Sequence, residues 1–178
     1  MRKRGFEIAR GYEDKNYRKM KEIAGKESSD FKVLIVDDIP LNLLLLDKML
    51  MPYSFQMVKA NGGREALKEV ASRLDTAEQI DLVIVDLMMP EVDGYQVIEN
   101  LRKGCEIDGI TIPPQSKTDL PIVILSGLSF EEDVNKGMAL GANLYLTKPI
   151  VMNKLYEAVN QLLTKLKIFH ANGSDTQN

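Results

Sequence analysis

Three short apolar runs, each followed at once by a polar side chain, constrain the fold of this 178-residue chain more than any other feature. They are 32–36 before Asp37 and Asp38, 81–85 before Asp86, and 120–125 before Ser126. Continuous β-branched and aliphatic runs are typical of strands buried on both faces, as in a parallel sheet. Two weaker runs, at 55–60 and 143–146, continue the rhythm, so we expect five strands.

Between these runs, apolar residues recur at the three- and four-residue steps of amphipathic helices. We expect helices over 63–74, 92–103 and 151–166, a fourth from Pro40 and a fifth from about Ser129. Pro40 is a favoured first helical residue, and we expect its helix to bury the face formed by Leu41, Leu44, Leu45 and Met49. Ser129 and Glu132 have the spacing of a capping box. Five strands alternating with five helices predict an α/β fold with right-handed crossovers.

The composition excludes several classes of protein. A hydrophobic fraction of 44% with 28% charged residues is ordinary for a globular chain and too apolar for a disordered one. No apolar run approaches the ~20 residues of a membrane span, and the basic start lacks the apolar segment of a secretory signal. One cysteine, Cys105, and one histidine, His170, exclude internal disulfides and Cys- or His-rich metal sites. We therefore expect a cytoplasmic protein.

Charge is distributed unevenly along the chain. Residues 1–26 carry a net charge of +5 and the remainder −8, so a basic arm precedes an acidic body. Such an arm can mark an anionic partner, although a solvated helix explains it as well. We expect a helical extension and linker over 1–30, one domain over 31–168 with an inserted loop at 104–119, and a disordered tail over 169–178.

The polar residues that follow the strands indicate where the chemistry lies. In a doubly wound sheet, ligands bind at the carboxyl ends of the strands, which here gather Asp37, Asp38, Asp86, Ser126 and Lys148. Three carboxylates brought together in a low dielectric need a cation, and carboxylates with waters suit Mg²⁺. Helix capping would explain one of these acids but not the whole set.

Taken together, these motifs resemble the receiver domain of two-component response regulators, over roughly residues 31–168. The resemblance rests on the pair Asp37 and Asp38, the segment DLMMPEVDG from Asp86, the pair Ser126 and Gly127, and the pair Lys148 and Pro149. It implies a chemotaxis-regulator-like domain, either stand-alone or from a hybrid histidine kinase. It also implies a flavodoxin-like, five-stranded parallel sheet with strand order 2-1-3-4-5.

The resemblance assigns a role to each site residue. Asp86 would accept a phosphoryl group from a phosphohistidine donor. Asp38, Asp86 and the Met88 main-chain carbonyl would bind Mg²⁺, with Asp37 acting through a water or by orienting Asp38. The phosphoryl group would be contacted by Lys148, the Ser126 hydroxyl and the Gly127 amide. Pro149 would follow a cis peptide bond that aims Lys148 inward.

The same resemblance implies a conformational switch. Ser126 would move toward the phosphoryl group, and Tyr145 would turn inward from solvent into the vacated space. The face made by the fourth helix, fifth strand and fifth helix would then bind a downstream protein. The phosphoryl donor would be a sensor histidine kinase or a histidine phosphotransfer protein. Segments 1–30 and 104–119 would offer a partner or dimer surface away from the site.

Two other functions compete with this interpretation. An Asp-nucleophile phosphohydrolase usually has a second Asp two residues after the nucleophile, where this chain has Met88. We therefore expect no turnover enzyme. A receiver module that acts as a phosphorylation-independent scaffold would also fit, although every key side chain is present. After Leu166 too few residues follow for a helix-turn-helix, and His170 is too near the terminus for a phosphotransfer histidine.

Overall fold

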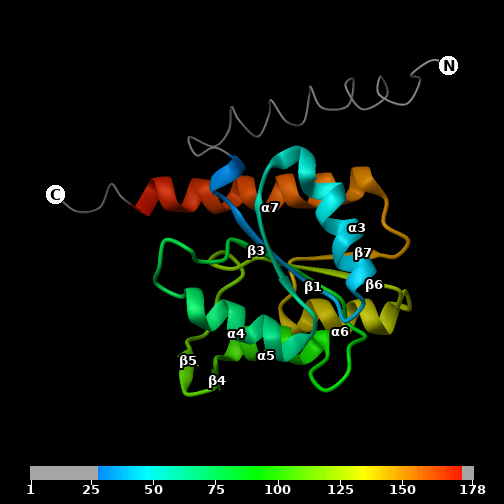
Figure 1. The fold of residues 1–178 in the computed structure, drawn as a ribbon, viewed down its shortest axis with the longest axis horizontal. Helices are drawn as coiled ribbons and strands as arrows, with labels where there is room; N and C mark the ends of the chain where they lie inside the picture. Colours follow the sequence, from blue (N-terminus) through cyan, green and yellow to red (C-terminus); the bar gives the residue numbers. More distant parts are fainter. Residues whose placement is uncertain (1–27, 174–178) are drawn as a thin grey trace, which may run out of the picture.

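The computed structural model describes residues 28–173, with side chains described through residue 164. Most of the helical extension and linker expected over 1–30 therefore lies outside the described residues, as do 174–178. The chain forms an α/β fold with helices on both faces of a central sheet (Figure 1). Its elements are η1 (Ser28–Asp30), β1 (Lys32–Val36), α3 (Pro40–Leu50), η2 (Met51–Tyr53), β2 (Gln56–Ala60), α4 (Gly63–Arg73), β3 (Leu82–Val85), α5 (Gly94–Lys103), β4 (Cys105–Ile107), β5 (Ile110–Ile112), β6 (Ile122–Ser126), α6 (Glu131–Leu140), β7 (Leu144–Thr147) and α7 (Met152–Gly173).

The central sheet has five parallel strands in the order β2-β1-β3-β6-β7. Counted among these five strands, the order is 2-1-3-4-5, which confirms the predicted fold class. β1, β3 and β6 are buried along their whole length, as their apolar runs predict. Helices α3 and α7 cover one face of the sheet, and α4, α5 and α6 cover the other (Figure 1).

The predicted core face of α3 is wrong except for Met49, which packs against the core. Leu43, Leu46 and Leu50 are the buried leucines of this helix, whereas Leu41, Leu44 and Leu45 are exposed. The helix carries apolar residues around most of its circumference, so its sequence periodicity does not select one face. Packing against the sheet and α7 makes that selection, and it leaves an apolar surface on the outer side of α3.

Two predicted helix starts also differ from the structure. α6 is capped by Phe130 without a side-chain bond, so the predicted capping box at Ser129 is wrong. Three acids in the first turn of α6 complement its helix dipole instead. A true capping box occurs at α5, where Asp93 and Gln96 bond reciprocally, and this helix begins at Gly94 rather than at residue 92.

The segment 104–119 is more ordered than the loop that we expected. It contains the antiparallel strand pair β4 and β5, and its Asp108 forms ion pairs with Arg64 and Lys68 of α4. In its later part, the Ser116 carbonyl accepts the Leu120 amide just before β6, and the Lys117 carbonyl accepts Asn143 Nδ2 just before β7. The segment therefore lies at the amino edge of the sheet, as predicted.

The last helix is also longer than predicted. The backbone of α7 stays helical through Gly173, so its end lies beyond residue 166 and the tail expected over 169–178 is helical in its first part. Within 28–173, no helix combines the length and the apolar character needed to cross a membrane.

Candidate functional site

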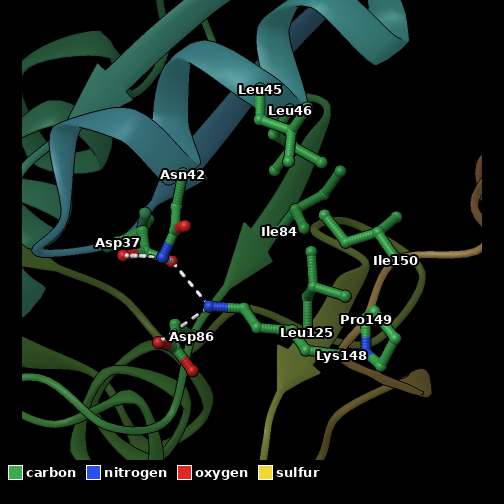
Figure 2. A pocket seen from close by; sticks show the side chains of 11 residues that line it. Asp37, Asn42, Leu45, Leu46, Ile84, Asp86, Leu125, Lys148, Pro149 and Ile150 are labelled. Atoms are coloured by element: carbon green, nitrogen blue, oxygen red, sulfur yellow. Dashed lines mark hydrogen bonds and ion pairs between the residues drawn. The ribbon is translucent and has the colours of Figure 1, made fainter.

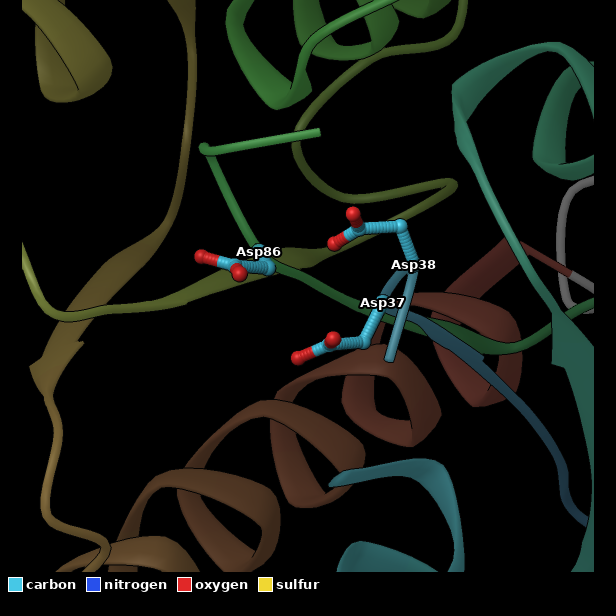
Figure 3. Close-up of side chains that lie close together, drawn as sticks. All are labelled: Asp37, Asp38 and Asp86. Carbon is cyan, nitrogen blue, oxygen red and sulfur yellow. The ribbon is translucent and has the colours of Figure 1, made fainter. Parts of the chain in front are cut away.

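Strand register brings the acidic residues together. Val36 of β1 pairs with Val85 of β3, and the Asp86 amide donates to the Val36 carbonyl at 2.9 Å. The next residues, Asp37 and Asp86, therefore lie side by side. One carboxylate oxygen from each of Asp37, Asp38 and Asp86 falls within 4.8 Å of the others (Figure 3). Asp37 and Asp86 are buried and Asp38 is half-buried, so the cluster opens to solvent on the Asp38 side.

Lys148 supplies the opposite charge from the far end of the chain. Its Nζ lies 2.8 Å from Oδ2 of Asp37 and 3.1 Å from Oδ2 of Asp86 (Figure 2). Burial lowers the pKa of Lys148, but the two carboxylates outweigh that effect and raise the pKa above its usual value. The peptide bond between Lys148 and Pro149 is cis, as predicted.

The Asp86 carboxylate is held in one orientation. Its Oδ1 accepts the main-chain amides of Leu87 at 2.7 Å and Met88 at 3.4 Å, while Oδ2 faces Lys148. The main chain of Met88 thus lies beside the acid, and its side chain is exposed. Main-chain amides therefore hold one carboxylate oxygen of Asp86, and an ammonium holds the other.

Gly94 explains how the loop after Asp86 keeps its shape. A Cβ on Gly94 would lie 2.2 Å from the Asp86 carbonyl oxygen, so a side chain at this position cannot fit. The Gly94 amide donates to Leu87, and Asp93 caps α5 immediately before it. The start of α5 is therefore packed directly onto the backbone of the central acid.

Ser126 and Gly127 lie at the end of β6, beside Lys148. The Lys148 amide donates to the Ser126 carbonyl at 2.8 Å, which ties the two strand ends together. Ser126 is fully buried, and its hydroxyl accepts the Leu128 amide at 3.3 Å. Gly127, the next residue, is exposed.

Tyr145 already lies inward in this structure. The side chain is half-buried, and its hydroxyl donates to the Leu128 carbonyl at 2.7 Å. Burial is the main cause of its raised pKa. Gly137 of α6 contributes to the packing, because a Cβ there would lie 2.4 Å from Ile124 and 3.5 Å from the Tyr145 ring. Tyr145 therefore links β7 to the loop that follows Ser126.

Asn42 is a site residue that our assignment from the sequence missed. It lies in the first turn of α3, and its Nδ2 is 3.0 Å from both oxygens of Asp37. Asn42 lines a cavity of about 190 Å³ together with Asp37, Asp86, Lys148 and apolar side chains that include Leu45 and Ile150 (Figure 2). The sequence signal that could have indicated this role is an asparagine in the first helical turn after two consecutive acids.

These residues also suit a divalent metal ion. Three carboxylates contribute oxygen donors only, and two of them are buried, which favours a hard cation over a soft one. Lys148 offsets part of their negative charge from the opposite side. The site can therefore hold a cation at its open, Asp38 side while keeping an ammonium at its inner side.

Residues 33–160 match the response regulator receiver domain family, and the chain belongs to this family of two-component signalling proteins. Two-component response regulator ARR11 of Arabidopsis thaliana is 35% identical over 134 residues, which are 75% of this chain and 23% of that protein. The chain spans about half or less of the length of the first curated relatives that it matches.

Two solved structures extend the comparison. A probable two-component system response regulator/GGDEF domain protein has a TM-score of 0.70 and 25% identity, covering 85% of this chain and 55% of its own. The CheX-CheY-BeF3-Mg²⁺ complex from Borrelia burgdorferi has a TM-score of 0.61 and 25% identity, covering 74% of this chain and 88% of that chain.

Proposed function

We propose that this receiver domain takes a phosphoryl group from a phosphohistidine onto Asp86 and thereby changes a protein-binding face. The observation that carries the proposal is the placement of Asp86: a buried, oriented carboxylate between two further acids and the ammonium of Lys148. An acid held this way can act as a nucleophile once its charge repulsion with an incoming phosphoryl group is offset.

The chain's own residues divide the work of this transfer. A carboxylate oxygen of Asp86 forms the new bond to phosphorus as the bond from phosphorus to the donor imidazole nitrogen breaks. Lys148 shifts from Asp37 toward the phosphoryl oxygens, and the Ser126 hydroxyl and Gly127 amide donate to the others. The departing imidazole nitrogen keeps the electron pair of the broken bond to phosphorus.

Asp38, Asp86 and the Met88 carbonyl are the residues that would hold Mg²⁺, with Asp37 acting through a water or by orienting Asp38. When bound, the ion would neutralise charge between the carboxylate and the phosphoryl oxygens. The solved complex from Borrelia burgdorferi contains Mg²⁺ and BeF3, which supports a Mg²⁺ site in this chain. No step of the chemistry requires a residue that this chain lacks.

The donor is a sensor histidine kinase or a histidine phosphotransfer protein. Leu41 and Leu45 of α3 are exposed, and so are Val151 and Met152 at the start of α7. Leu45 also lines the cavity that holds Asp86. Leu45 therefore borders the acid, and together the exposed apolar side chains offer a docking surface for a donor helix.

The downstream partner binds the face formed by α6, β7 and α7. Tyr145 and the loop after Ser126 connect this face to the site, and Phe130 stands exposed at its edge. The acceptor is consumed by transfer and restored by hydrolysis, so the domain is a switch rather than a turnover enzyme. We also propose a cytoplasmic location. Segments 1–30 and 104–119 would offer a partner or dimer surface away from the site.

Intact mass after incubation with acetyl phosphate tests the proposal. We expect one phosphoryl adduct in the presence of Mg²⁺, none after chelation, and none in Asp86→Asn. Asp75→Asn, which changes an exposed acid, should be labelled like the natural sequence. If neither acetyl phosphate nor phosphorylated kinases label a protein that binds Mg²⁺, the domain is a constitutive interaction module instead.

A further inference from the structure

Like the acid that we propose as acceptor, the Asp37 carboxylate accepts hydrogen bonds from three groups. Its Oδ1 accepts the Ile39 amide at 2.9 Å and Asn42 Nδ2 at 3.0 Å. Its Oδ2 accepts Asn42 Nδ2 at 3.0 Å and Lys148 Nζ at 2.8 Å. Asn42 thus contacts both oxygens of a buried carboxylate, and it is a neutral donor among charged groups.

The first turn of α3 holds Asn42 in place. Pro40 starts the helix, and the Asn42 amide nitrogen of the main chain donates to the Ile39 carbonyl at 2.9 Å. From this turn the Asn42 side chain reaches back to the Asp37 carboxylate. Figure 2 shows Asn42 on one side of Asp37 and Lys148 on the other.

Asp37 and Asp86 compete for one ammonium. Lys148 lies between them, 2.8 Å from Asp37 and 3.1 Å from Asp86, and every further donor to a carboxylate weakens the attraction that it exerts on the ammonium. Hydrogen bonds from Asn42 reduce the negative potential that Asp37 projects toward Lys148 and toward the open side of the acid cluster. Without them, Asp37 would hold Lys148 more tightly and would attract a cation more strongly.

We propose that Asn42 is a positioning residue, which acts through Asp37 to keep Lys148 available for the phosphoryl group and to moderate the affinity for the divalent cation. This inference rests on the proposed function. It predicts effects of opposite sign on two ligands when the donor is removed. A merely structural role would weaken both ligands together, because a loosened site binds everything less well.

The test compares Asn42→Leu, which has a similar volume and no donor, with Asn42→Gln, which keeps the amide. Binding of Mg²⁺ alone is followed by backbone amide NMR, and binding of BeF3⁻ is followed at saturating Mg²⁺. We expect Asn42→Leu to bind Mg²⁺ about threefold to tenfold more tightly and BeF3⁻ more weakly by a similar factor, the scale of a partly screened hydrogen bond to a charged group. Asn42→Gln should lie nearer to the natural sequence in both.

A second readout needs no ligand. The ¹⁵Nζ resonance of Lys148 in metal-free protein should shift in Asn42→Leu, because the ammonium moves toward Asp37. Asn135→Ala, an exposed asparagine on α6, serves as the control and should change nothing.

The outcomes separate the two proposals. Both affinities falling together in Asn42→Leu, or both staying within twofold with an unmoved Lys148 resonance, would overturn the role of Asn42. Failure of the natural sequence to bind Mg²⁺ and BeF3⁻ would instead overturn the proposed function, while the Lys148 resonance would still decide whether Asn42 positions the ammonium.

Discussion

Lys148 and Asp86 are 62 positions apart in the sequence, and the Nζ atom of one lies 3.1 Å from Oδ2 of the other. The same ammonium contacts Asp37, so one cation separates two buried carboxylates. This arrangement ties the ends of β1, β3 and β7 together at the edge where the acids gather. Several consequences of it can be measured.

Replacing Lys148 with Met should lower the free energy of unfolding by about 1–2 kcal/mol in metal-free protein, because Asp37 and Asp86 then face each other without a shared cation. Urea unfolding followed by circular dichroism measures the change. Lys103→Met is the matched control, since the ion pair of Lys103 with Glu99 is largely exposed. This variant should lose at most a few tenths of the stability that Lys148→Met loses. Equal losses in the two variants would contradict the prediction.

The pKa of Lys148 should lie above the ordinary lysine value of 10.5, because the two carboxylates outweigh the cost of its burial. A folded-state pKa above the unfolded one means that the ion pair stabilises the fold fully below pH 10.5, and that this contribution is lost as pH rises through the folded pKa. A ¹³Cε–¹⁵Nζ NMR titration measures it. Asp86→Asn should bring the pKa down, and an unchanged value would argue against the pairing.

Gly94→Ala should displace the loop that carries Asp86, because the added Cβ meets the Asp86 carbonyl at 2.2 Å. We expect a loss of about 1–3 kcal/mol in stability and slower labelling by acetyl phosphate. Gly62→Ala is the control, since no atom lies within 4 Å of a Cβ there and its φ of 166° is extended backbone. Equal labelling rates in both variants would rule out this steric role of Gly94.

Met88 and Leu128 should lengthen the lifetime of a phosphoryl group on Asp86. Both are apolar, they follow Asp86 and Ser126 by two residues, and neither can orient an attacking water. The double variant Met88→Asn, Leu128→Glu should lose the phosphoryl group on the order of tenfold faster. This factor is smaller than the rate enhancement that a well-positioned general base gives. Decay of the adduct by intact mass measures this. A half-life that does not differ from that of the double variant would refute the idea.

Arg102 should be the main anchor of the segment 104–119. Its guanidinium donates to the carbonyls of Gln115 at 3.1 Å and Ser116 at 3.2 Å within the segment, and to that of Leu120 at 2.9 Å just after it. Arg102→Ala removes this donor from all three carbonyls and should cost about 3 kcal/mol. Urea unfolding provides the measurement. Arg64→Ala, which removes an exposed ion pair with Asp108, should cost under about 1 kcal/mol, and a similar cost in both would show that Arg102 is no special anchor.

The strands and the acid cluster could be predicted because their signals are local. Each run of apolar residues is short, contiguous and followed directly by its acid, so strand direction alone places Asp37, Asp38 and Asp86 at one edge. The order of the strands came from the family resemblance and was confirmed. The cis bond before Pro149 was confirmed in the same way.

The remaining features depend on contacts between distant segments. The leucines of α3 are too evenly spread for periodicity to select Leu43, Leu46 and Leu50 as its buried face. The β4 and β5 pair is held by ion pairs from α4, which no pattern within 104–119 reveals. The inward position of Tyr145 depends likewise on space beside Gly137.

The sequence by itself determined which chemical groups stand at the ends of the strands, because a residue's place after a buried run is a property of its neighbours in the chain. The tertiary structure alone decided how those groups pair. Lys148 reaches Asp37 and Asp86 through the register of β1, β3, β6 and β7, and Asn42 reaches Asp37 through the first turn of α3. Hydrogen bonds act over about 3 Å, and that distance is set by packing across the whole domain.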